Sequence, residues 1–506
     1  MTTQGLFWAD EIAQSIAAKG DTFVAATGIT PSGHIHIGNM REVLTADVVV
    51  KALRQLGKDV TFYYIADTFD PLRRVYPFLD QKVFEPHVGK PLSEIPGPGR
   101  EGQSYAEYFL EPFLESLKAL DIHVDLLRAD QMYKEGRYVE NIIKAMEATP
   151  LIREILQKET GKETPEHWSP FQPICQFTGK MTGNMVLGFD PKAQTVHYRN
   201  EEGQEGECSM SGGGKLTWRL DWPARWQMLG VRFEPFGKDH ASKGGSYDTA
   251  IRFAREIFNY EPPYPATYEW ISLKGGGDMS SSKGNVLSIA EMVDVIPPEV
   301  LKYSVSKVKP SKRIVFDPGL PMLNLIDEFD DPEVKTRNPR AVELSAISGH
   351  PPLGVPFKHI VSLIQVTQGD VDKLAQKLNK AGYAVDDMAA LKSRAAYATQ
   401  WLEKFGPEDI KFEIQAKMPP QSFDLSDVQK KALRSLGDQL QESMDASAIH
   451  DLIYQIKNDL GIEPGQVFLA IYTALLGKNR GPRAGFFLAS LDTDFVKERF
   501  LQVAQA

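Results

Sequence analysis

The most constraining feature of this chain is an alternation of strand and helix signals near its N-terminus. Residues 22–28 (TFVAATG) are small, β-branched and aromatic and end at a glycine, which is typical of a buried strand. After a loop containing proline and glycine, apolar residues recur every four positions from His36 towards Gly57, which indicates an amphipathic helix. Residues 60–67 (VTFYYIAD) again have the pattern of a strand. This order predicts a doubly wound α/β unit with a right-handed crossover.

The patterns change several times along the rest of the chain. A mixed segment with helical stretches and glycine-rich, strand-like stretches is interpreted as an insertion at about 90–215. Regular signals return at 218–229, and a further strand is expected at 268–273 (YEWISL). Beyond about 290 the apolar residues follow helical spacing. The predicted division is an α/β domain at 1–290 with its insertion, a helical domain at 291–390 and an all-helical domain at 391–506.

The loop after the first expected strand carries a group of residues suited to phosphate chemistry. It reads PSGHIHIGN (31–39), and ligands in such sheets bind at the carboxyl ends of the strands. Gly38 allows a nucleotide close to the backbone, and the helix N-terminus near His36 offers oriented N–H groups. His36 and Asn39 lie three residues apart at that end, so two neutral donors can stabilise charge on a phosphate. Taken alone, these residues more often serve as helix caps and turns.

A second candidate lies about 240 residues further along, after the strand expected at 268–273. Glycines at 275–277 lead into Met279-Ser280-Ser281-Ser282-Lys283-Gly284-Asn285, where a hydroxyl cluster and a lysine are suited to gripping phosphate. Such a segment by itself is most often a surface loop. Two phosphate-binding candidates at two expected strand ends indicate a nucleotide site far more specifically than either candidate alone.

Together the two segments resemble the HIGH and KMSKS signatures of class I aminoacyl-tRNA synthetases, with Asn39 at the position of the second histidine. More narrowly, the chain is similar to the archaeal-type class I lysyl-tRNA synthetases from about residue 5 to about residue 489. The blocks that carry this similarity are TGITPSGHIHIGNMREV, DPLRRVYPFL, WRLDWPARW, PFGKDHASKGGSYDT and MSSSKGN.

The resemblance implies a Rossmann-like catalytic domain followed by an all-helical anticodon-binding region. It implies activation of L-lysine by ATP with Mg²⁺, release of pyrophosphate, and transfer of lysine to the 3′-terminal adenosine of tRNA(Lys). The implied catalytic residues are His36, Asn39 and Lys283. The implied ATP-binding residues are His34, Gly38, Met279, Ser280, Ser281, Ser282 and Lys283. Asp278 stands where the wider family has a lysine, and a negative charge beside pyrophosphate is unfavourable.

The lysine substrate needs an anion for its ammonium group and a donor for its carboxylate. The resemblance implies that Gly28, Thr30, Trp218, His240 and Tyr268 form the amino-acid pocket, with the two aromatic side chains on either side of the aliphatic stem. The candidate anions are the carboxylates of Asp67, at an expected strand end, and Asp239, beside His240; each can equally be a helix cap or a surface ion pair. Asp221 is assigned to a structural network.

Cysteine content and apolar patterning bear on metals and location. Cys175, Cys208 and His197 are three candidates at irregular spacing, and a structural zinc site usually needs four, so no metal site is expected. No run approaches the 18 apolar residues of a membrane span, and the N-terminus has no secretory pattern. The prediction is a cytoplasmic protein without a membrane partner.

Net charge at first argues against a nucleic-acid partner. The chain has 57 Lys and Arg against 67 Asp and Glu, a net charge of −10. Net charge does not say where the charges lie, however. We expect tRNA to contact local basic clusters. Their members are Lys302, Lys307, Lys309, Lys312, Arg313, Lys478, Arg480 and Arg483.

Three alternatives remain open at this point. A small-molecule nucleotidylyltransferase shares an HxGH-type site but has no use for about 200 helical residues. A non-catalytic tRNA-binding paralogue is favoured only by Asp278. A glutamyl-type class I synthetase would need a basic pocket for its substrate carboxylate, which the surroundings of Trp218 and Tyr268 do not suggest.

Overall fold

The computed structural model describes residues 6–99, 101–279, 286–347 and 353–506. The chain separates into two compact units, each built from three segments. Unit 1 comprises residues 1–293, 301–316 and 340–347, and unit 2 comprises residues 294–300, 317–339 and 348–506. The division into three domains expected from the sequence stays a prediction.

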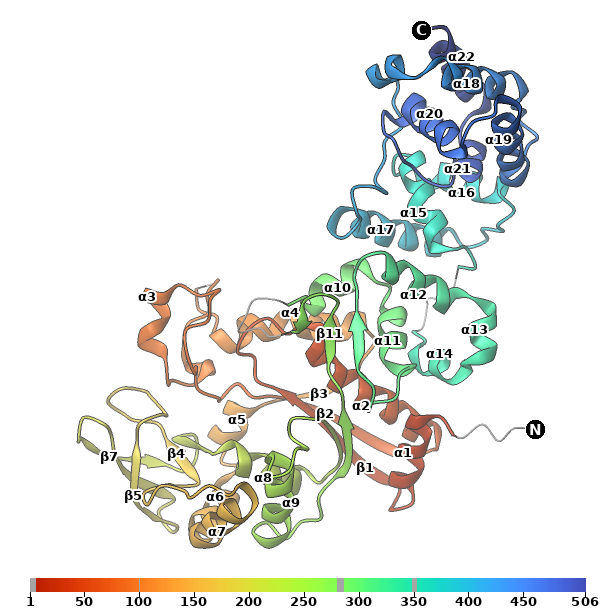
Figure 1. The fold of residues 1–506 in the computed structure, drawn as a ribbon. Coiled ribbons are helices and arrows are strands. Elements are labelled where there is room, and N and C mark those ends of the chain that lie inside the picture. Colours follow the sequence, from red (N-terminus) through yellow and green to blue (C-terminus); the bar gives the residue numbers. More distant parts are fainter. Residues whose placement is uncertain (1–5, 100, 280–285, 348–352) are drawn as a thin grey trace. The chain divides into compact units, whose positions relative to one another are not determined.

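The centre of unit 1 is a five-stranded sheet in the order β10-β9-β1-β2-β3, parallel throughout (Figure 1). The strands are β1 (Thr22–Ile29), β2 (Asp59–Ala66), β3 (Asp125–Arg128), β9 (Val231–Gly237) and β10 (Tyr264–Tyr268). The two expected N-terminal strands are confirmed as β1 and β2, which pair from Thr22 with Asp59 to Ile29 with Ala66. Their short apolar runs form adjacent strands near the middle of the sheet, as continuous apolar strands usually do.

The strand order fixes where a ligand can bind. The chain runs from β1 outward through β2 to β3 and later returns on the other side of β1 with β9 and then β10. In open parallel sheets, ligands bind in the crevice at the carboxyl ends of the two strands where the order reverses. Here those strands are β1 and β9, so the crevice lies beside Gly28 and Gly237, near the strand ends.

Helix α2 (Ile37–Gln55) is the helix expected between the first two strands, and it packs against β1, β2 and β9. His36 is its N-cap, and Gly57 with φ of 77° follows its end. The side chains of Met40, Val43 and Leu44 are fully buried. The remaining helices around this sheet are α1 (Trp8–Ala17), α4 (Tyr105–Ala119), α5 (Ala129–Lys134), α8 (Trp218–Leu229) and α9 (Ser246–Glu256).

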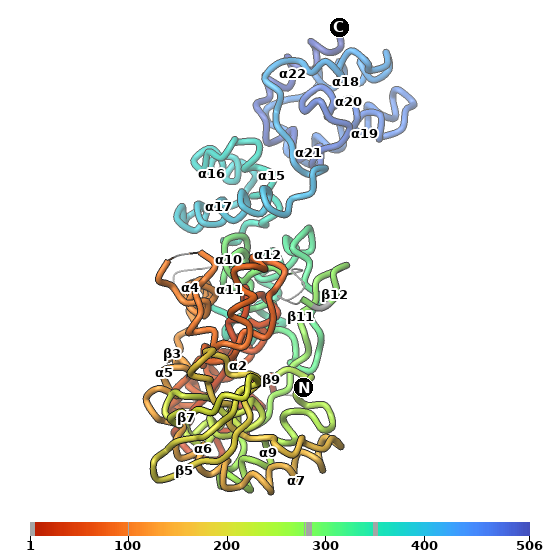
Figure 2. Tube along the Cα trace, turned by 90° about the vertical axis from the view of Figure 1, so that its left-hand side faces the viewer, coloured from red at the N-terminus to blue at the C-terminus, as the bar shows by residue number. Residues whose placement is uncertain are grey.

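The expected insertion has its own small sheets and core. Its three-stranded sheet is β5 (Met185–Asp190), β6 (Thr195–Arg199) and β7 (Glu205–Ser209), and its two-stranded sheet is β4 (Phe171–Pro173) with β8 (Gly214–Leu216). Figure 2 shows β5 and β7 at the same end of unit 1 as helices α6 (Val139–Glu147) and α7 (Thr149–Thr160). Shorter turns precede them: α3 (Gln81–Phe84), η1 (Glu85–His87) and η2 (Leu92–Glu94).

The single strand expected at 268–273 is wrong. Tyr268 ends β10, whereas β11 (Ile271–Leu273) belongs to a separate sheet with β12 (Gly277–Asp278) and β13 (Ile314–Phe316). Apolar spacing cannot show this change of sheet, because the chain continues in an extended conformation with similar residues.

Helix α11 (Pro298–Ser306) contributes a buried cation to unit 1. The Lys302 side chain has no exposed surface, and its Nζ lies 3.0 Å from Asp47 Oδ2 and donates to the Leu120 carbonyl at 2.9 Å. Burial lowers the pKa of Lys302 to about 8. The expectation that Lys302 contacts tRNA is therefore wrong, because the side chain is locked inside the fold. Lys309, Lys312 and Arg313 are exposed.

Unit 2 is helical, as the apolar stripes indicate. One of its apolar clusters contains Leu433, Leu436, Ile453 and Ile471, in the part of the chain where the apolar residues follow helical spacing. The helices from residue 289 on, including those divided between the units, are α10 (Ile289–Val295), α11, α12 (Leu320–Asp330), α13 (Pro332–Arg337), α14 (Pro339–Ser345), α15 (Phe357–Val366), α16 (Val371–Lys380), α17 (Met388–Lys404), η4 (Pro420–Asp424), α18 (Asp427–Gln439), α19 (Ala446–Leu460), α20 (Pro464–Leu476), α21 (Ala484–Ser490) and α22 (Thr493–Gln505).

The described residues include no helix suited to a membrane and no cluster suited to a metal ion. None of their helices is long and apolar enough to cross a bilayer. No group of three His, Cys, Asp or Glu in the same described ranges is arranged to hold a metal ion. Cys175 is buried, and its Sγ accepts a hydrogen bond from Asn200 Nδ2 at 3.6 Å. Cys208 lies in β7.

Candidate active site

The first signature forms the N-terminus of α2. The His36 N–H donates to Asn39 Oδ1 at 3.2 Å, so Asn39 closes the first turn of the helix. A Cβ at Gly38 would lie 2.8 Å from the His36 ring, a distance at which the ring would have to move. Glycine at this position therefore lets the imidazole lie close against the helix start.

Burial controls the charge of His36. The residue is 8% exposed, and burial lowers its pKa to about 4. Its Nδ1 is buried without a hydrogen-bond partner among the described residues. At neutral pH the imidazole is therefore uncharged, and its role as a neutral donor to phosphate stays a prediction.

The two signatures meet in space. The Ile37 N–H donates to the Leu287 carbonyl at 3.1 Å, and the Ile289 N–H donates to the Ile35 carbonyl at 3.1 Å. Met279 also approaches the first signature, because its Cε lies 3.5 Å from where a Gly38 Cβ would stand. The first residue of the second signature and the residues just after it are thus held against the start of α2. Ser280, Ser281, Ser282 and Lys283 lie outside the described residues, so their roles stay predictions.

His34 lies in different surroundings from His36. Its exposed ring packs at 5.1 Å, edge to face, with Phe109 and at 6.0 Å from Phe78. It also lines a cavity of about 460 Å³ together with Val286 and Glu291. This cavity lies beside the joined signatures, and the ATP-binding role of His34 stays a prediction.

Glu42 is the residue that the sequence interpretation missed. It lies in α2 about one turn after Gly38; its Oε1 accepts from the Gly28 N–H at 3.0 Å and its Oε2 accepts from the Tyr268 hydroxyl at 2.9 Å. Gly28 and Tyr268 are both predicted lysine-pocket residues, at the carboxyl ends of β1 and β10. One carboxylate therefore joins two predicted pocket residues that are 240 positions apart.

The surroundings of Glu42 disfavour its negative charge. Burial raises the pKa of Glu42 to about 8, and the nearby carboxylates of Glu234 and Asp67 add to this effect. The hydrogen bonds from Gly28 and Tyr268 act in the opposite direction. A buried carboxylate without a paired cation is costly, so a cationic ligand here would be bound strongly.

Aromatic rings form the neighbouring part of the crevice. Trp218 stacks on Trp222 with ring centroids 5.5 Å apart, and His240 lies 6.1 Å from Trp218. Asp239 is exposed, and its Oδ2 lies 3.8 Å from His240 Nε2. The structure thus brings Trp218, His240 and Asp239 together.

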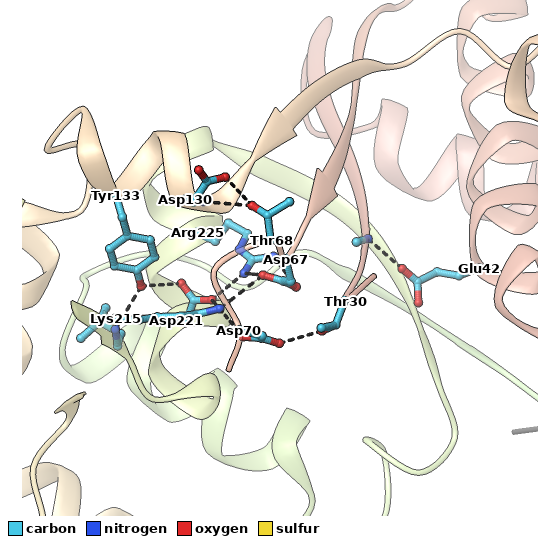
Figure 3. A network of polar contacts seen from close by, with 12 residues as sticks. Thr30, Glu42, Asp67, Thr68, Asp70, Asp130, Tyr133, Lys215, Asp221 and Arg225 are labelled. Atoms are coloured by element: carbon cyan, nitrogen blue, oxygen red, sulfur yellow. Dashed lines mark hydrogen bonds and ion pairs between the residues drawn. The ribbon is translucent and has the colours of Figure 1, made fainter. Parts of the chain in front are cut away.

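A buried ion network lies at the carboxyl end of β2 (Figure 3). Arg225 NH2 lies 2.6 Å from Asp67 Oδ1 and 2.5 Å from Asp221 Oδ2. Lys215, from β8, places its Nζ 2.5 Å from Asp70 Oδ1 and 3.3 Å from Asp221 Oδ2. Asp221 therefore belongs to a structural network, as the sequence interpretation held. Asp67 already has the Arg225 guanidinium as its partner, which leaves it less available to a substrate ammonium than Glu42.

The network keeps its charges despite burial. Burial alone would lower the pKa of Lys215, but the carboxylates of Asp221, Asp70 and Asp67 raise it above its usual value. Burial would likewise raise the pKa of Asp221, yet the cations of Arg225 and Lys215 hold it below its usual value.

This network also holds the predicted lysine-binding loop. The Thr30 hydroxyl donates to Asp70 Oδ2 at 2.7 Å, as Figure 3 shows. A Cβ at Gly28 would lie 2.9 Å from the Ile65 carbonyl oxygen and 3.5 Å from Arg225 NH1, so only glycine fits there without a shift. The position of Thr30 therefore depends on Asp70, which is paired with Lys215 of β8.

Replacing Lys215 by methionine is expected to destabilise unit 1. The change would leave the buried carboxylates of Asp67 and Asp221 and the partly buried carboxylate of Asp70 with one cation. Removing one partner of a buried ion network typically costs about 3–5 kcal/mol. The melting temperature measured by calorimetry should fall clearly. The control is Lys192→Met at the exposed turn between β5 and β6, which should melt as the unmodified protein does; equal melting of both variants would contradict the assignment.

Comparison with known families agrees with this geometry. A family model described as tRNA synthetases class I (K) matches residues 6–346, and the chain belongs to this family. A second model, described as an anticodon binding domain, matches residues 360–504. The predicted α/β fold with an all-helical C-terminal region is thereby confirmed.

Curated relatives cover nearly the full chain. A protein named lysine–tRNA ligase from Methanosarcina barkeri (strain Fusaro) is 46% identical over 522 residues, covering 98% of this chain and 97% of its own. A protein of the same name from Archaeoglobus fulgidus is 46% identical over 496 residues, covering 98% and 99%.

Proposed function

We propose that this protein is a lysine–tRNA ligase of class I. It joins lysine to ATP, brought in as its magnesium complex, to give lysyl-adenylate and pyrophosphate. It then transfers the lysyl group to the 3′-terminal adenosine of tRNA(Lys). Family membership and full-length similarity to ligases of that name support this reaction. The observation that carries the amino-acid specificity is the Glu42 carboxylate held between Gly28 and Tyr268.

In the activation step the lysine carboxylate attacks the α-phosphate of ATP, and the pyrophosphate leaves. This reaction needs positioning and charge stabilisation rather than a protein nucleophile. Uncharged His36 at the N-terminus of α2 would donate to the phosphate as charge builds up on it, and Asn39 is proposed to assist. Lys283 is proposed to meet the leaving pyrophosphate.

Glu42 would receive the ε-ammonium of lysine. The two oxygens of the ionised Glu42 carboxylate share one negative charge. The hydrogen bonds from the Gly28 N–H and the Tyr268 hydroxyl fix the orientation of this carboxylate. Trp218, His240 and Thr30 are proposed to line the aliphatic stem and the α-amino end. A glutamate side chain in this pocket would place one carboxylate against another, which argues against the glutamyl-type alternative.

The deciding experiment is amino-acid-dependent ATP–pyrophosphate exchange with all twenty amino acids, with and without tRNA. We expect exchange with lysine alone. Exchange with glutamate would favour the glutamyl-type alternative. No exchange with any amino acid in either condition would favour the alternative of a non-catalytic tRNA-binding protein.

The KM for lysine is expected to depend on pH. Burial raises the pKa of Glu42 to about 8, so below that pH the empty site is protonated and must lose a proton to pair with an ammonium. The KM for lysine should therefore fall by up to about tenfold per unit as pH rises towards 8, and then level off. Exchange kinetics between pH 6.5 and 9 test this, with the KM for ATP as the internal control. A KM for lysine that stays constant over this range would contradict the assignment.

The tRNA is proposed to contact exposed cations in both units. Lys309, Lys312 and Arg313 lie on the surface of the described structure, as do Arg480 and Arg483 within the region matched by the anticodon-binding model. A protein with a net charge of −10 can therefore offer basic surface locally while it repels other nucleic acids elsewhere.

A further inference from the structure

Strand β9 carries a carboxylate at a position where an apolar side chain is the usual choice. Glu234 lies in the middle of β9 and is 6% exposed, and the side chains of Phe233 and Phe236 beside it are also buried. Strands in the interior of a parallel sheet are normally apolar throughout. Burying a carboxylate is unfavourable unless hydrogen bonds or cations compensate for the lost water. Glu234 therefore needs a partner inside the fold.

The partner of Glu234 is an indole of helix α8. Trp226 Nε1 donates to Glu234 Oε2 at 2.5 Å, and Trp226 is 1% exposed. The Arg225 guanidinium contributes only from a distance, because it is paired with two carboxylates of the buried ion network. Burial raises the pKa of Glu234 to about 7, and the charge of Arg225 and hydrogen bonds from the Trp226 and Trp222 indoles oppose this rise.

Three tryptophans of α8 form a row that begins at this hydrogen bond. Trp218, Trp222 and Trp226 are spaced four residues apart, so they lie on one side of the helix. The ring centroids of Trp226 and Trp222 are 4.9 Å apart, and the rings of Trp222 and Trp218 stack at 5.5 Å with 13° between their planes. His240 lies 5.6 Å from Trp222 and 6.1 Å from Trp218. This indole row thus runs from Glu234 to the predicted lysine pocket.

The hydrogen bond supplies what ring packing alone does not. Contacts between aromatic rings tolerate several arrangements, so stacked rings can slide and tilt at small cost. A hydrogen bond from an N–H to a carboxylate is directional and stronger than one between neutral groups. The bond to Glu234 therefore fixes the plane of the Trp226 ring. Trp222 packs on that ring and Trp218 packs on Trp222, so the orientation of Trp218 depends on an acceptor at the far end of the row.

We propose that Glu234 is a positioning residue for lysine activation, because it sets the orientation of Trp218 in the lysine pocket through Trp226 and Trp222. The inference rests on the proposed function and adds a residue to it. Glu42 is proposed to pair with the substrate ammonium directly, whereas Glu234 acts on the aromatic wall beside the aliphatic stem.

The test compares two substitutions that both remove the charge of Glu234. Glu234→Gln keeps an oxygen that accepts from the Trp226 indole, whereas Glu234→Met has similar length but no strong acceptor. In ATP–pyrophosphate exchange above pH 8, where Glu42 is mostly ionised, Glu234→Met should raise the KM for lysine about tenfold and leave the KM for ATP within about twofold. Glu234→Gln should keep the KM for lysine within about threefold of the unmodified value. Equal rises in both variants would assign the effect to charge and overturn the proposal.

A substitution of the donor tests the route independently and also serves if Glu234→Met does not fold. Trp226→Phe keeps an aromatic ring but loses the indole N–H, so its KM for lysine should rise about as much as in Glu234→Met. The double variant should be no worse than either single variant, because both changes break the same hydrogen bond. Effects that multiply in the double variant, or an unchanged KM for lysine in Trp226→Phe, would overturn the route through Trp226.

The indole N–H resonances of isotope-labelled tryptophan report on the row without any activity. In nuclear magnetic resonance spectra of the full chain, assigned with single tryptophan-to-phenylalanine variants, Glu234→Met should shift the resonances of Trp226, Trp222 and Trp218. A shift confined to Trp226 would show that the rings move independently and would overturn the proposal.

The matched control breaks a hydrogen bond at the start of the same strand. The Tyr260 hydroxyl donates to the Val231 carbonyl at 2.7 Å, so Tyr260→Phe should lower the melting temperature and leave the KM for lysine unchanged. The same behaviour in Glu234→Met would mean that Glu234 serves stability alone and would overturn the proposal. Absence of lysine-dependent exchange in the unmodified protein would instead reject the proposed function itself.

Discussion

Glu42→Gln is expected to raise the KM for lysine at least about 30-fold while the KM for ATP stays within about twofold. The amide keeps the size and one acceptor of the carboxylate but cannot pair with the substrate ammonium, and losing a buried charge partner costs about 2–5 kcal/mol. Steady-state ATP–pyrophosphate exchange over a range of lysine concentrations measures the effect. The pH dependence of the KM for lysine should vanish in the same variant.

The control is Glu115→Gln, an exposed glutamate in α4, which should behave as the unmodified enzyme. The comparison with Asp239→Asn and Asp67→Asn decides between the candidate anions. A larger rise in the KM for lysine in Asp239→Asn than in Glu42→Gln would place the ammonium at Asp239 and reject Glu42. Asp67→Asn should mainly lower the melting temperature, because Asp67 is paired with Arg225.

His36→Ala is expected to slow the exchange reaction by about 10²- to 10³-fold in kcat, because a preorganised donor to the reacting phosphate is lost. The variant should remain folded, since the Asn39 side chain still accepts from the backbone N–H of residue 36, and the melting temperature checks this. His36→Asn, which keeps a neutral donor, should recover part of the rate.

The pH profile tests the same assignment independently. Burial lowers the pKa of His36 to about 4, so kcat should show no histidine titration between pH 5.5 and 8. A kcat that falls with protonation near pH 6.5 would mean that the imidazole is exposed to water. A rate for His36→Ala near that of the unmodified enzyme would remove the residue from the site.

Much of the fold was predictable because its elements are locally encoded. The apolar runs of β1 and β2 and the four-residue spacing in α2 reveal their secondary structure without reference to the rest of the chain. The division of residues 268–273 between two sheets was not predictable. It depends on the pairing of β11 with β13, which lies about 40 residues further along the chain.

The candidate site shows the same limit. His36 and Gly38 were identifiable as candidates because a helix N-terminus that follows a strand commonly binds phosphate. Glu42 was missed because, in sequence, it is an ordinary polar residue in an amphipathic helix. Its proposed role rests on its bonds with Gly28 and Tyr268, which only the folded sheet brings to it. Lys302 was misjudged for the same reason, since its burial against Asp47 has no local signal.

The segmented composition of unit 1 matters for anyone who wishes to study it in isolation. Residues 301–316 and 340–347 belong to this unit although they follow the second signature. A fragment cut at residue 293 would lose β13 and so expose an edge of β11. It would also leave Asp47 without the Lys302 ammonium, and Trp8 without the Ser306 carbonyl that accepts its indole N–H at 2.8 Å. A fragment intended to retain amino-acid activation must therefore extend at least to residue 347.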